Sequence, residues 1–323
     1  MTAATIAVIT RDQDITADLV IAELAARGVA VTRFDVAAFP ERLEQVSYLE
    51  PGHREWTGTL RDDLHELDLS VLRAIWYRKP APFVPYHGLS STERRWAVAE
   101  AFHGFGGLLA SLNVHWISRP DRIAAAGHKP LQMALAAAAG LTVPPSLLTN
   151  SPDAAREFCV AHSGGVIYKP LDGGPGSESG RRVALRAAPV TADDITAGVR
   201  RTTHLFQARV PCAYSVRLAV VGRRFFATRI DLPAGTDTVD WRAEHARLQY
   251  TPIGVPDDVS AGVSCMLKAL GLNFAAPDFV VDHDGRWHFL GDLNPNGQWA
   301  WIDALRGPVT VAMADELIGE GPS

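Results

Sequence analysis

The stretch FLGDLNPNGQWAW, residues 289–301, decides the fold, because an apolar run leads to two oxygen-bearing side chains and then to a sharp turn. Side chains alternate along a strand, so Asp292 and Asn294 are expected to point the same way while Leu293 points into the core. Pro295 cannot belong to a central strand, and the Pro-Asn-Gly that it begins predicts a turn. The stretch therefore predicts paired oxygen donors at the end of a strand.

The composition limits the class of protein. The chain has 323 residues, 47% of them hydrophobic, which is enough for two or three packed lobes. A net charge of -5 and the lack of a basic run interleaved with aromatics argue against nucleic acid as a partner. No basic leader precedes the first apolar run, and the longest apolar stretch, residues 131–141, is too short to span a bilayer. We expect a cytoplasmic globular protein with no membrane partner.

Lysines and cysteines are both few. Only four of the 31 basic residues are lysines, namely Lys79, Lys129, Lys169 and Lys268. Because the chain otherwise uses arginine, a lysine weakly indicates a chemical role. The three cysteines have neither a C-x-x-C partner nor a histidine cluster, so we expect ordinary buried thiols and no zinc site or disulfide framework. They are Cys159, Cys212 and Cys265.

The first part of the chain predicts a β-α-β lobe. An apolar run at residues 5–10 is followed by apolar residues at helical spacing that end on Gly28, and then by a second strand at residues 29–35. Doubly wound sheets open in this way. No G-x-G-x-x-G follows the first strand, so a dinucleotide-binding fold is not supported.

The middle of the chain predicts two helical pieces and a glycine-rich hairpin. Gly127 and Pro130 are expected to break one helical pattern in two. The segment DGGPGSESG, residues 172–180, joins two strand-like runs, and its amides can approach an anion without side chains in the way. A phosphate-covering flap and a solvated hairpin loop are both consistent with this segment. Residues 191–201 predict a further helix.

The second half gathers groups suited to one task. Asp278 leaves one expected strand, and Asp292 with Asn294 leaves the next, which would give three oxygen ligands for Mg²⁺. Alone, Asp278 would be read as a turn or surface carboxylate, and its pairing with D-x-N-P-N-G makes it a metal candidate. Lys169 ends an apolar strand and Lys129 lies at the helix break, where each ammonium could bind a phosphate or simply be solvated.

The order of these features resembles the ATP-grasp superfamily of carboxylate ligases. The details WYRKP at residues 76–80, HKPLQMALAAAAGLTVPPSLLTN at 128–150 and NPNGQWAW at 294–301 are similar to ATP-grasp ribosomal peptide maturases, also called graspetide synthetases. The resemblance implies an α/β (α+β) ATP-grasp fold that clamps ATP. Its parts would be an N-terminal pre-ATP-grasp α/β domain, a central lobe with the flap, and a C-terminal, mostly antiparallel lobe with the Mg²⁺ site. The implied boundaries are 1–118, 119–206 and 207–323.

The resemblance also implies roles for individual residues. The implied ATP-binding residues are two phosphate-binding lysines, four flap residues and a hinge that holds adenine through backbone: Lys129, Lys169, Gly173, Gly174, Gly176, Ser177, Gln207, Ala208, Arg209 and Val210. Arg217 and Arg242 would act on the transferred phosphoryl group and the substrate carboxylate. Asp278, Asp292 and Asn294 would bind Mg²⁺.

Three positions depart from the family pattern. Ala208 stands where an acidic residue is common, Ser215 replaces the aspartate of the D-x-R motif that Arg217 completes, and Asp292 replaces a glutamate. A backbone contact tolerates the change at Ala208. The change at Ser215 puts any role of that position in doubt.

The activity that the resemblance implies is ADP-forming ligation. Asp or Glu side chains of a ribosomal precursor peptide, with leader and core, would be activated as acyl phosphates and joined to Ser or Thr hydroxyls or Lys amines. The implied cofactors are ATP and Mg²⁺, and a homodimer is expected. Two alternatives stay open: a ligase for free amino acids or for tailing a protein, and a nucleotide-binding regulator without catalysis.

Overall fold

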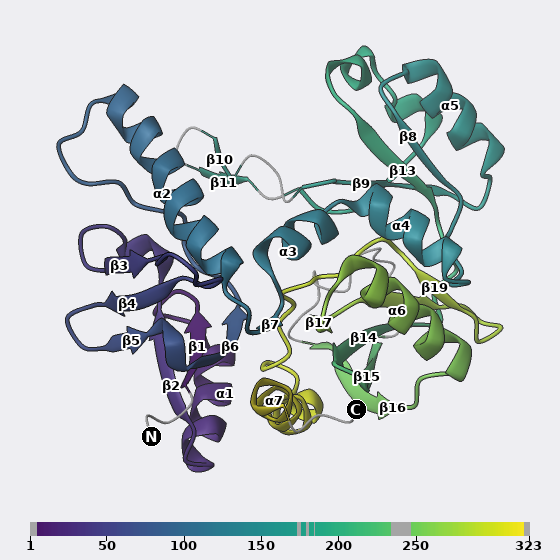
Figure 1. Cartoon of the computed structure of the whole chain (residues 1–323). Helices are drawn as coiled ribbons and strands as arrows, with labels where there is room; N and C mark the ends of the chain where they lie inside the picture. The colour runs from purple at the N-terminus through teal and green to yellow at the C-terminus, as the bar shows by residue number, and fades with distance from the viewer. Residues whose placement is uncertain (1–4, 173–175, 179–180, 184, 234–246, 320–323) are drawn as a thin grey trace.

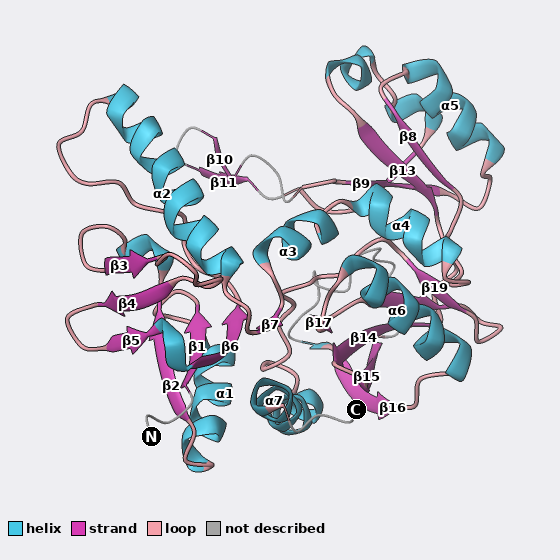
Figure 2. Cartoon of the chain, in the orientation of Figure 1, coloured by secondary structure: helices cyan, strands magenta, loops and turns pink. Residues whose placement is uncertain are grey.

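The structure is a computed structural model that describes residues 5–172, 176–178, 181–183, 185–233 and 247–319. Figure 1 shows an N-terminal lobe, a central lobe reached through one short helix, and a C-terminal lobe beside both. Figure 2 shows both helices and strands in all three lobes. Among the described residues, no helix has the length and apolarity that crossing a bilayer requires.

The N-terminal lobe is built on a parallel sheet of order β2-β1-β6-β7. Its strands and flanking helices are β1 (Thr5–Ile9), β2 (Ala30–Phe34), β6 (Leu72–Tyr77), β7 (His115–Ile117), α1 (Ile15–Ala26) and α2 (Ser91–Ser111). A small antiparallel sheet comprises β3 (Glu44–Tyr48), β4 (Thr57–Arg61) and β5 (Glu66–Asp68). The two central strands, β1 and β6, are nearly continuous apolar runs because both faces of the sheet are covered there.

The central lobe has an antiparallel sheet of order β12-β9-β13-β8. Its elements are α3 (Pro120–Ala126), α4 (Lys129–Ala138), β8 (Ser146–Thr149), α5 (Pro152–Ala161), β9 (Val166–Lys169), β12 (Ala188–Val190) and β13 (His204–Ala208). The hairpin of β10 (Gly176–Glu178) and β11 (Arg181–Val183) follows β9. The helix break at Gly127 is confirmed, and Pro130 lies in the first turn of α4, where its missing N–H costs nothing.

The C-terminal lobe is antiparallel throughout, in the order β16-β15-β14-β18-β19, with β17 paired to β14. Its elements are β14 (Tyr214–Val221), β15 (Arg224–Asp231), β16 (Gln249–Ile253), α6 (Asp257–Leu270), β17 (Phe274–Ala275), β18 (Asp278–Val281), β19 (Trp287–Phe289) and α7 (Asp303–Ile318). The mixed α/β fold and the antiparallel C-terminal sheet are therefore as predicted.

Three sequence expectations are wrong. Residues 191–201 form two 3-10 turns, Ala192–Asp194 and Ala197–Arg201, because Thr191 and Thr196 cap short turns and Gly198 weakens any longer helix. The strand at Trp287 ends at Phe289, so Asp292 and Asn294 lie in an irregular segment after it. Of the cysteines, Cys212 and Cys265 are exposed and Cys159 is half-buried.

Helix α7 joins the N-terminal and C-terminal lobes. One buried cluster contains Val20 of α1, Trp76 of β6, Ala219 of β14 and Val309 and Met313 of α7. Figure 1 shows α7 between α1 and the β14–β16 strands. The N-terminal sheet therefore completes its core with residues that lie more than half the chain away.

A buried ion pair lies at the edge of this shared core. Arg78 is 1% exposed, and its Nε donates to Asp14 Oδ2 at 2.8 Å. The guanidinium carbon of Arg78 lies 5.4 Å from the Trp76 ring centroid and 5.3 Å from that of Trp299. The two indole rings stack at 6.1 Å. Ionisation of Asp14 is favoured because Arg78 and Thr10 outweigh the effect of burial, so the pKa of Asp14 is lowered.

The Arg78→Met substitution is expected to lower the free energy of unfolding by about 3 kcal/mol, because it leaves Asp14 as an unpaired buried charge. Urea unfolding followed by circular dichroism measures the loss. Asp14→Asn combined with Arg78→Met is expected to lose less than the sum of the single changes. The matched control is Arg61→Met, which breaks a pair with Glu44 whose side chains are 56% and 57% exposed, and is expected to cost less than about 1 kcal/mol. Equal losses for Arg78→Met and Arg61→Met would contradict the assignment.

Candidate functional site

Asp292 is held by the two lysines that the sequence singles out. Its Oδ1 lies 2.9 Å from Lys129 Nζ, and its Oδ2 lies 2.8 Å from Lys169 Nζ. Lys129 begins α4, and Lys169 ends β9 and also donates to Leu290 O at 2.6 Å. Burial alone would raise the pKa of Asp292, but the two ammonium groups outweigh it and hold that pKa well below its ordinary value. Asp292 is therefore ionised at neutral pH.

A second charged group lies beside the first. Arg217 in β14 is directly opposite Asp278, the first residue of β18, and its Nη1 donates to Asp278 Oδ1 at 2.9 Å. Asn294 Nδ2 donates to the other Asp278 oxygen at 3.1 Å. Both Arg217 and Asp278 are 5% exposed, so this pair is fixed inside the fold. The structure thus brings Asp278, Asp292 and Asn294 together, with Asp278 beginning a strand where the sequence analysis has it leaving one.

The segment between Asp292 and Asn294 is fixed by its backbone. Leu293 is fully buried, as expected, and its N–H donates to Gln132 Oε1 of α4 at 3.0 Å. The carbonyl of Asp292 accepts from the N–H of Asp278 at 3.0 Å. Asn294 has a φ of 49°, a left-handed conformation that asparagine tolerates better than most residues. A left-handed turn, and not strand alternation, therefore directs the Asn294 amide to Asp278.

The donor set fits a hard cation that shares its shell with phosphate. The described residues include no group of three or more His, Cys, Asp or Glu side chains that could enclose a metal ion by themselves. Two carboxylates and one amide remain, and Mg²⁺ commonly takes only a few protein oxygens beside phosphate and water. Asp278, Asp292 and Asn294 therefore suit Mg²⁺ that arrives with a nucleotide.

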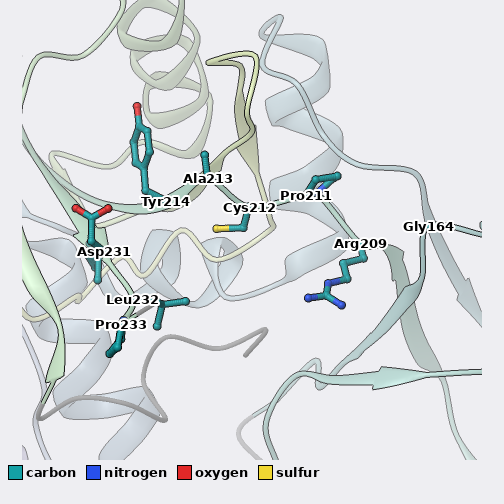
Figure 3. Close-up of a pocket in the computed structure, with 10 residues that line it drawn as sticks. Gly164, Arg209, Pro211, Cys212, Ala213, Tyr214, Asp231, Leu232 and Pro233 are labelled. Carbon is teal, nitrogen blue, oxygen red and sulfur yellow. The ribbon is translucent and has the colours of Figure 1, made fainter. Parts of the chain in front are cut away.

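A cavity surrounds the expected hinge. The N–H of Ala208 donates to Pro145 O at 2.8 Å and that of Arg209 to Gly165 O at 2.9 Å, which fixes the end of β13. A cavity of about 460 Å³ beyond it is lined by residues of the hinge and of β14 and β15, including Arg209, Cys212 and Asp231 (Figure 3). A smaller cavity, also bordered by Arg209 and Cys212, has further lining from Lys169, Gln207, Ala208 and Val210. The hinge therefore borders a cavity of ligand size. The smaller cavity connects the hinge with Lys169.

The Gly297–Trp299 segment joins two arginines. Arg78 Nη1 donates to Gly297 O at 3.4 Å, and Arg217 Nη2 donates to Gln298 O at 3.1 Å. A Cβ at Gly297 would lie 2.3 Å from the Ala276 Cβ and 2.9 Å from Arg217 Nη2, so only glycine fits. The sequence analysis assigned no role to Arg78. The only local signal was an arginine directly after the buried strand in WYRKP.

Some predicted site residues cannot be placed. Gly173, Gly174 and Arg242 lie outside the described residues. Gly176 and Ser177 lie in β10, whose backbone pairs with β11. The expected flap therefore includes β10, the first strand of a short hairpin, and β11 follows the flap.

Comparison with known proteins identifies a similar domain and similar folds. Residues 5–124 match the family described as the MvdD pre-ATP grasp domain. None of the curated proteins matches the chain. Among solved structures, the chain is similar to macrocyclase MdnC of Microcystis aeruginosa MRC, bound with precursor peptide MdnA, at 26% identity and a TM-score of 0.83, covering 98% of this chain and 99% of that one.

Two further structures share the fold. A Chryseobacterium gregarium RiPP-associated ATP-grasp ligase, in complex with ADP and a leader and core peptide, is 24% identical with a TM-score of 0.89, covering 98% of this chain and 97% of that one. ATP-grasp ligase PsnB, complexed with a phosphomimetic variant of minimal precursor, Mg and ADP, is 22% identical with a TM-score of 0.73, covering 99% of both chains. Residues 5–124 are therefore similar to the MvdD pre-ATP grasp domain, and the chain as a whole has the fold of these ATP-grasp ligases.

Proposed function

We propose that the chain is an ADP-forming ATP-grasp ligase that crosslinks a ribosomal precursor peptide. The observation that carries the proposal is the convergence of Lys129, Lys169 and Asp292 with Arg217 and Asp278 beside the hinge cavity. This set can neutralise a triphosphate and orient it, which is most of what phosphoryl transfer needs from a protein. MdnC and the Chryseobacterium ligase, which have this fold, are described with their peptides.

The proposed reaction has two steps. A carboxylate oxygen of a peptide Asp or Glu attacks the γ-phosphorus of ATP, the bond from that phosphorus to the β-γ bridging oxygen breaks, and an acyl phosphate and ADP result. A Ser or Thr hydroxyl or a Lys amine then attacks the acyl carbon and expels phosphate. The hydroxyl proton leaves with the phosphate, and an amine releases its extra proton to solvent. Each crosslink costs one ATP and removes one water from the peptide.

The residues of the site have distinct proposed roles. Lys129 and Lys169 exchange Asp292 for phosphate oxygens, and Asp278, Asp292 and Asn294 hold Mg²⁺, which offsets phosphate charge when bound. Arg217 stabilises the charge on the transferred phosphoryl group. The adenine hinge comprises Gln207, Ala208, Arg209 and Val210. The family resemblance is the basis for the roles of Gly173, Gly174, Gly176, Ser177 and Arg242.

Other parts of the proposal rest on the sequence analysis. They are the lobe boundaries 1–118, 119–206 and 207–323, the homodimer, the cytoplasmic location and the lack of a nucleic-acid partner. A non-catalytic regulator is the less favoured alternative, because Lys129, Lys169 and Arg217 are all present and gathered with the proposed metal ligands. A ligase for free amino acids is distinguished by the experiment below.

The protein is incubated with ATP, Mg²⁺ and the precursor peptide that a neighbouring short reading frame encodes. The peptide is expected to lose the mass of one water per crosslink, and one ADP should be released for each crosslink. Mass spectrometry of the peptide and a coupled assay for ADP give both numbers. Omission of Mg²⁺ is the control and should stop both. Gain of an amino-acid mass, or ADP release that ignores the peptide, would favour the free amino-acid alternative.

Asp292→Asn and Asn294→Ala are each expected to slow crosslinking about a hundredfold or more, because the first removes the negative charge of one metal ligand and the second removes the oxygen of another. Calorimetry should also show weaker Mg²⁺-dependent binding of ADP. Asp303→Asn, at an 88% exposed carboxylate on α7, is the matched control and should retain full activity. Full activity of the Asp292→Asn, Asn294→Ala double variant, with unaltered ADP binding, would rule out the metal assignment.

Lys169→Met is expected to raise the KM for ATP by roughly tenfold to a hundredfold, the size of one lost charge-assisted hydrogen bond to phosphate. The initial rate of ADP release, measured against ATP concentration at saturating peptide, gives this value. Lys268→Met, at an exposed lysine on α6, is the control. If the two variants behave alike, Lys169 does not bind phosphate.

A further inference from the structure

Lys79 is the one half-buried lysine to which the proposed ATP and Mg²⁺ sites give no role. It follows β6, and Arg11 follows β1, which is the neighbouring parallel strand. The N–H of Arg78 donates to Ile9 O at 2.9 Å, and the N–H of Arg11 donates to Lys79 O at 3.3 Å. Both basic segments therefore leave the carboxyl edge of the parallel sheet, the edge at which open α/β sheets bind ligands.

The charges around Lys79 are unbalanced. Arg78 is paired with Asp14, and Arg217 is paired with Asp278. In the part of the chain that the structure describes, the Lys79 ammonium has no ion pair or side-chain hydrogen bond. By contrast, Lys129 and Lys169 share Asp292, and Lys268 is exposed on α6. Lys79 is thus a partly desolvated cation with no direct ion-pair partner among the described residues.

Lys79 is linked to Arg217 through the Gly297–Gln298 segment. Arg78, the chain neighbour of Lys79, donates to Gly297 O at 3.4 Å, and Arg217 donates to the next carbonyl, Gln298 O, at 3.1 Å. Arg217 in turn pairs with Asp278, which accepts from Asn294. The segment that carries Lys79 therefore adjoins the Arg217–Asp278 pair, and the charge of Arg217 acts on Lys79.

We infer that Lys79 binds the side-chain carboxylate of the peptide residue that is activated, and this rests on the proposed function. The carboxylate oxygen must approach a γ-phosphoryl group that is itself anionic, so cations beside both reactants lower the barrier. Arg217 can serve the phosphoryl side and Lys79 the carboxylate side. The N-terminal lobe then supplies a substrate-binding group as well as a scaffold.

The pKa of Lys79 is consistent with a site that binds an anion. Burial, followed by the positive charges of Arg78, Arg11 and Arg217, lowers the pKa of Lys79 to about 8 against the opposing charge of Asp14. A bound carboxylate would favour the charged form. An ammonium with a pKa near 8 also acylates readily at that pH, and this makes Lys79 measurable.

Competitive acetylation tests the inference on the whole wild-type protein. Limiting acetic anhydride at pH 8 labels lysines, and a chain with only four allows each to be followed by mass spectrometry, with exposed Lys268 as the internal reference. The protein is held with Mg²⁺ and a non-hydrolysable ATP analogue. Millimolar acetyl-Gly-Glu-Gly-amide is expected to reduce labelling of Lys79 at least threefold, whereas acetyl-Gly-Gln-Gly-amide should not. Equal labelling of Lys79 with the two peptides would overturn the inference.

Variants test the same role in the reaction. Lys79→Met is expected to raise the KM for the precursor peptide about tenfold with little change in the KM for ATP, and Lys79→Arg should recover most of the loss because it keeps the charge. Lys268→Met removes the same charge elsewhere and should leave both values unchanged. An unchanged peptide KM in Lys79→Met would refute the role. If wild-type protein forms no crosslink, the proposed function fails, while the acetylation result still decides whether Lys79 binds a carboxylate.

Discussion

The pair of Asp14 and Arg78 is the interaction on which the rest of the structure depends. It is buried at the edge of the core that the N-terminal sheet shares with α7, and Trp76 and Trp299 lie against its guanidinium. The same guanidinium donates to the carbonyl of Gly297, so the chain that leaves the proposed metal site is tied to the first lobe. A methionine could fill this volume but could not hold both Asp14 and Gly297. The pair thus contributes more to the positions of Asp14 and Gly297 than to the free energy of unfolding, since buried ion pairs seldom add net stability.

The charges of the proposed nucleotide site are paired with one another without any ligand, with one positive charge in excess. Asp292 pairs with both lysines that would bind phosphate, and Arg217 pairs with Asp278. Nucleotide binding would then be an exchange of partners, in which phosphate displaces Asp292 from the lysines and frees a carboxylate for the metal. Such an exchange gains less long-range attraction than a bare cationic pocket, but it avoids leaving buried charges unpaired when the site is empty.

Much of the fold and of the site could be predicted from local patterns. Helical spacing, glycine and proline placed α1 and the break before Lys129, and the scarcity of lysine drew attention to Lys129 and Lys169. The conformation of Asn294 could not be predicted, because its amide is directed by Asp278 across the sheet. Arg78 was missed because its partners Asp14 and Gly297 lie 64 and 219 residues away, and no periodicity reports such contacts. Residues 191–201 were misjudged because their side-chain caps compete with helical hydrogen bonds.

Helix α7 has a consequence for how the protein comes to be folded. The N-terminal strands and α1 leave the ribosome before residues 303–318, yet these later residues cover part of the surface that the first lobe buries. Until then Val20, Trp76 and their neighbours are partly exposed. The first lobe is therefore incompletely folded and prone to aggregation during synthesis. Completion of the core and closure of the proposed active site are then one event, because Trp299 and Asn294 immediately precede the helix that completes the core. A chain that stops short of α7 would lose the site together with the fold of its first lobe.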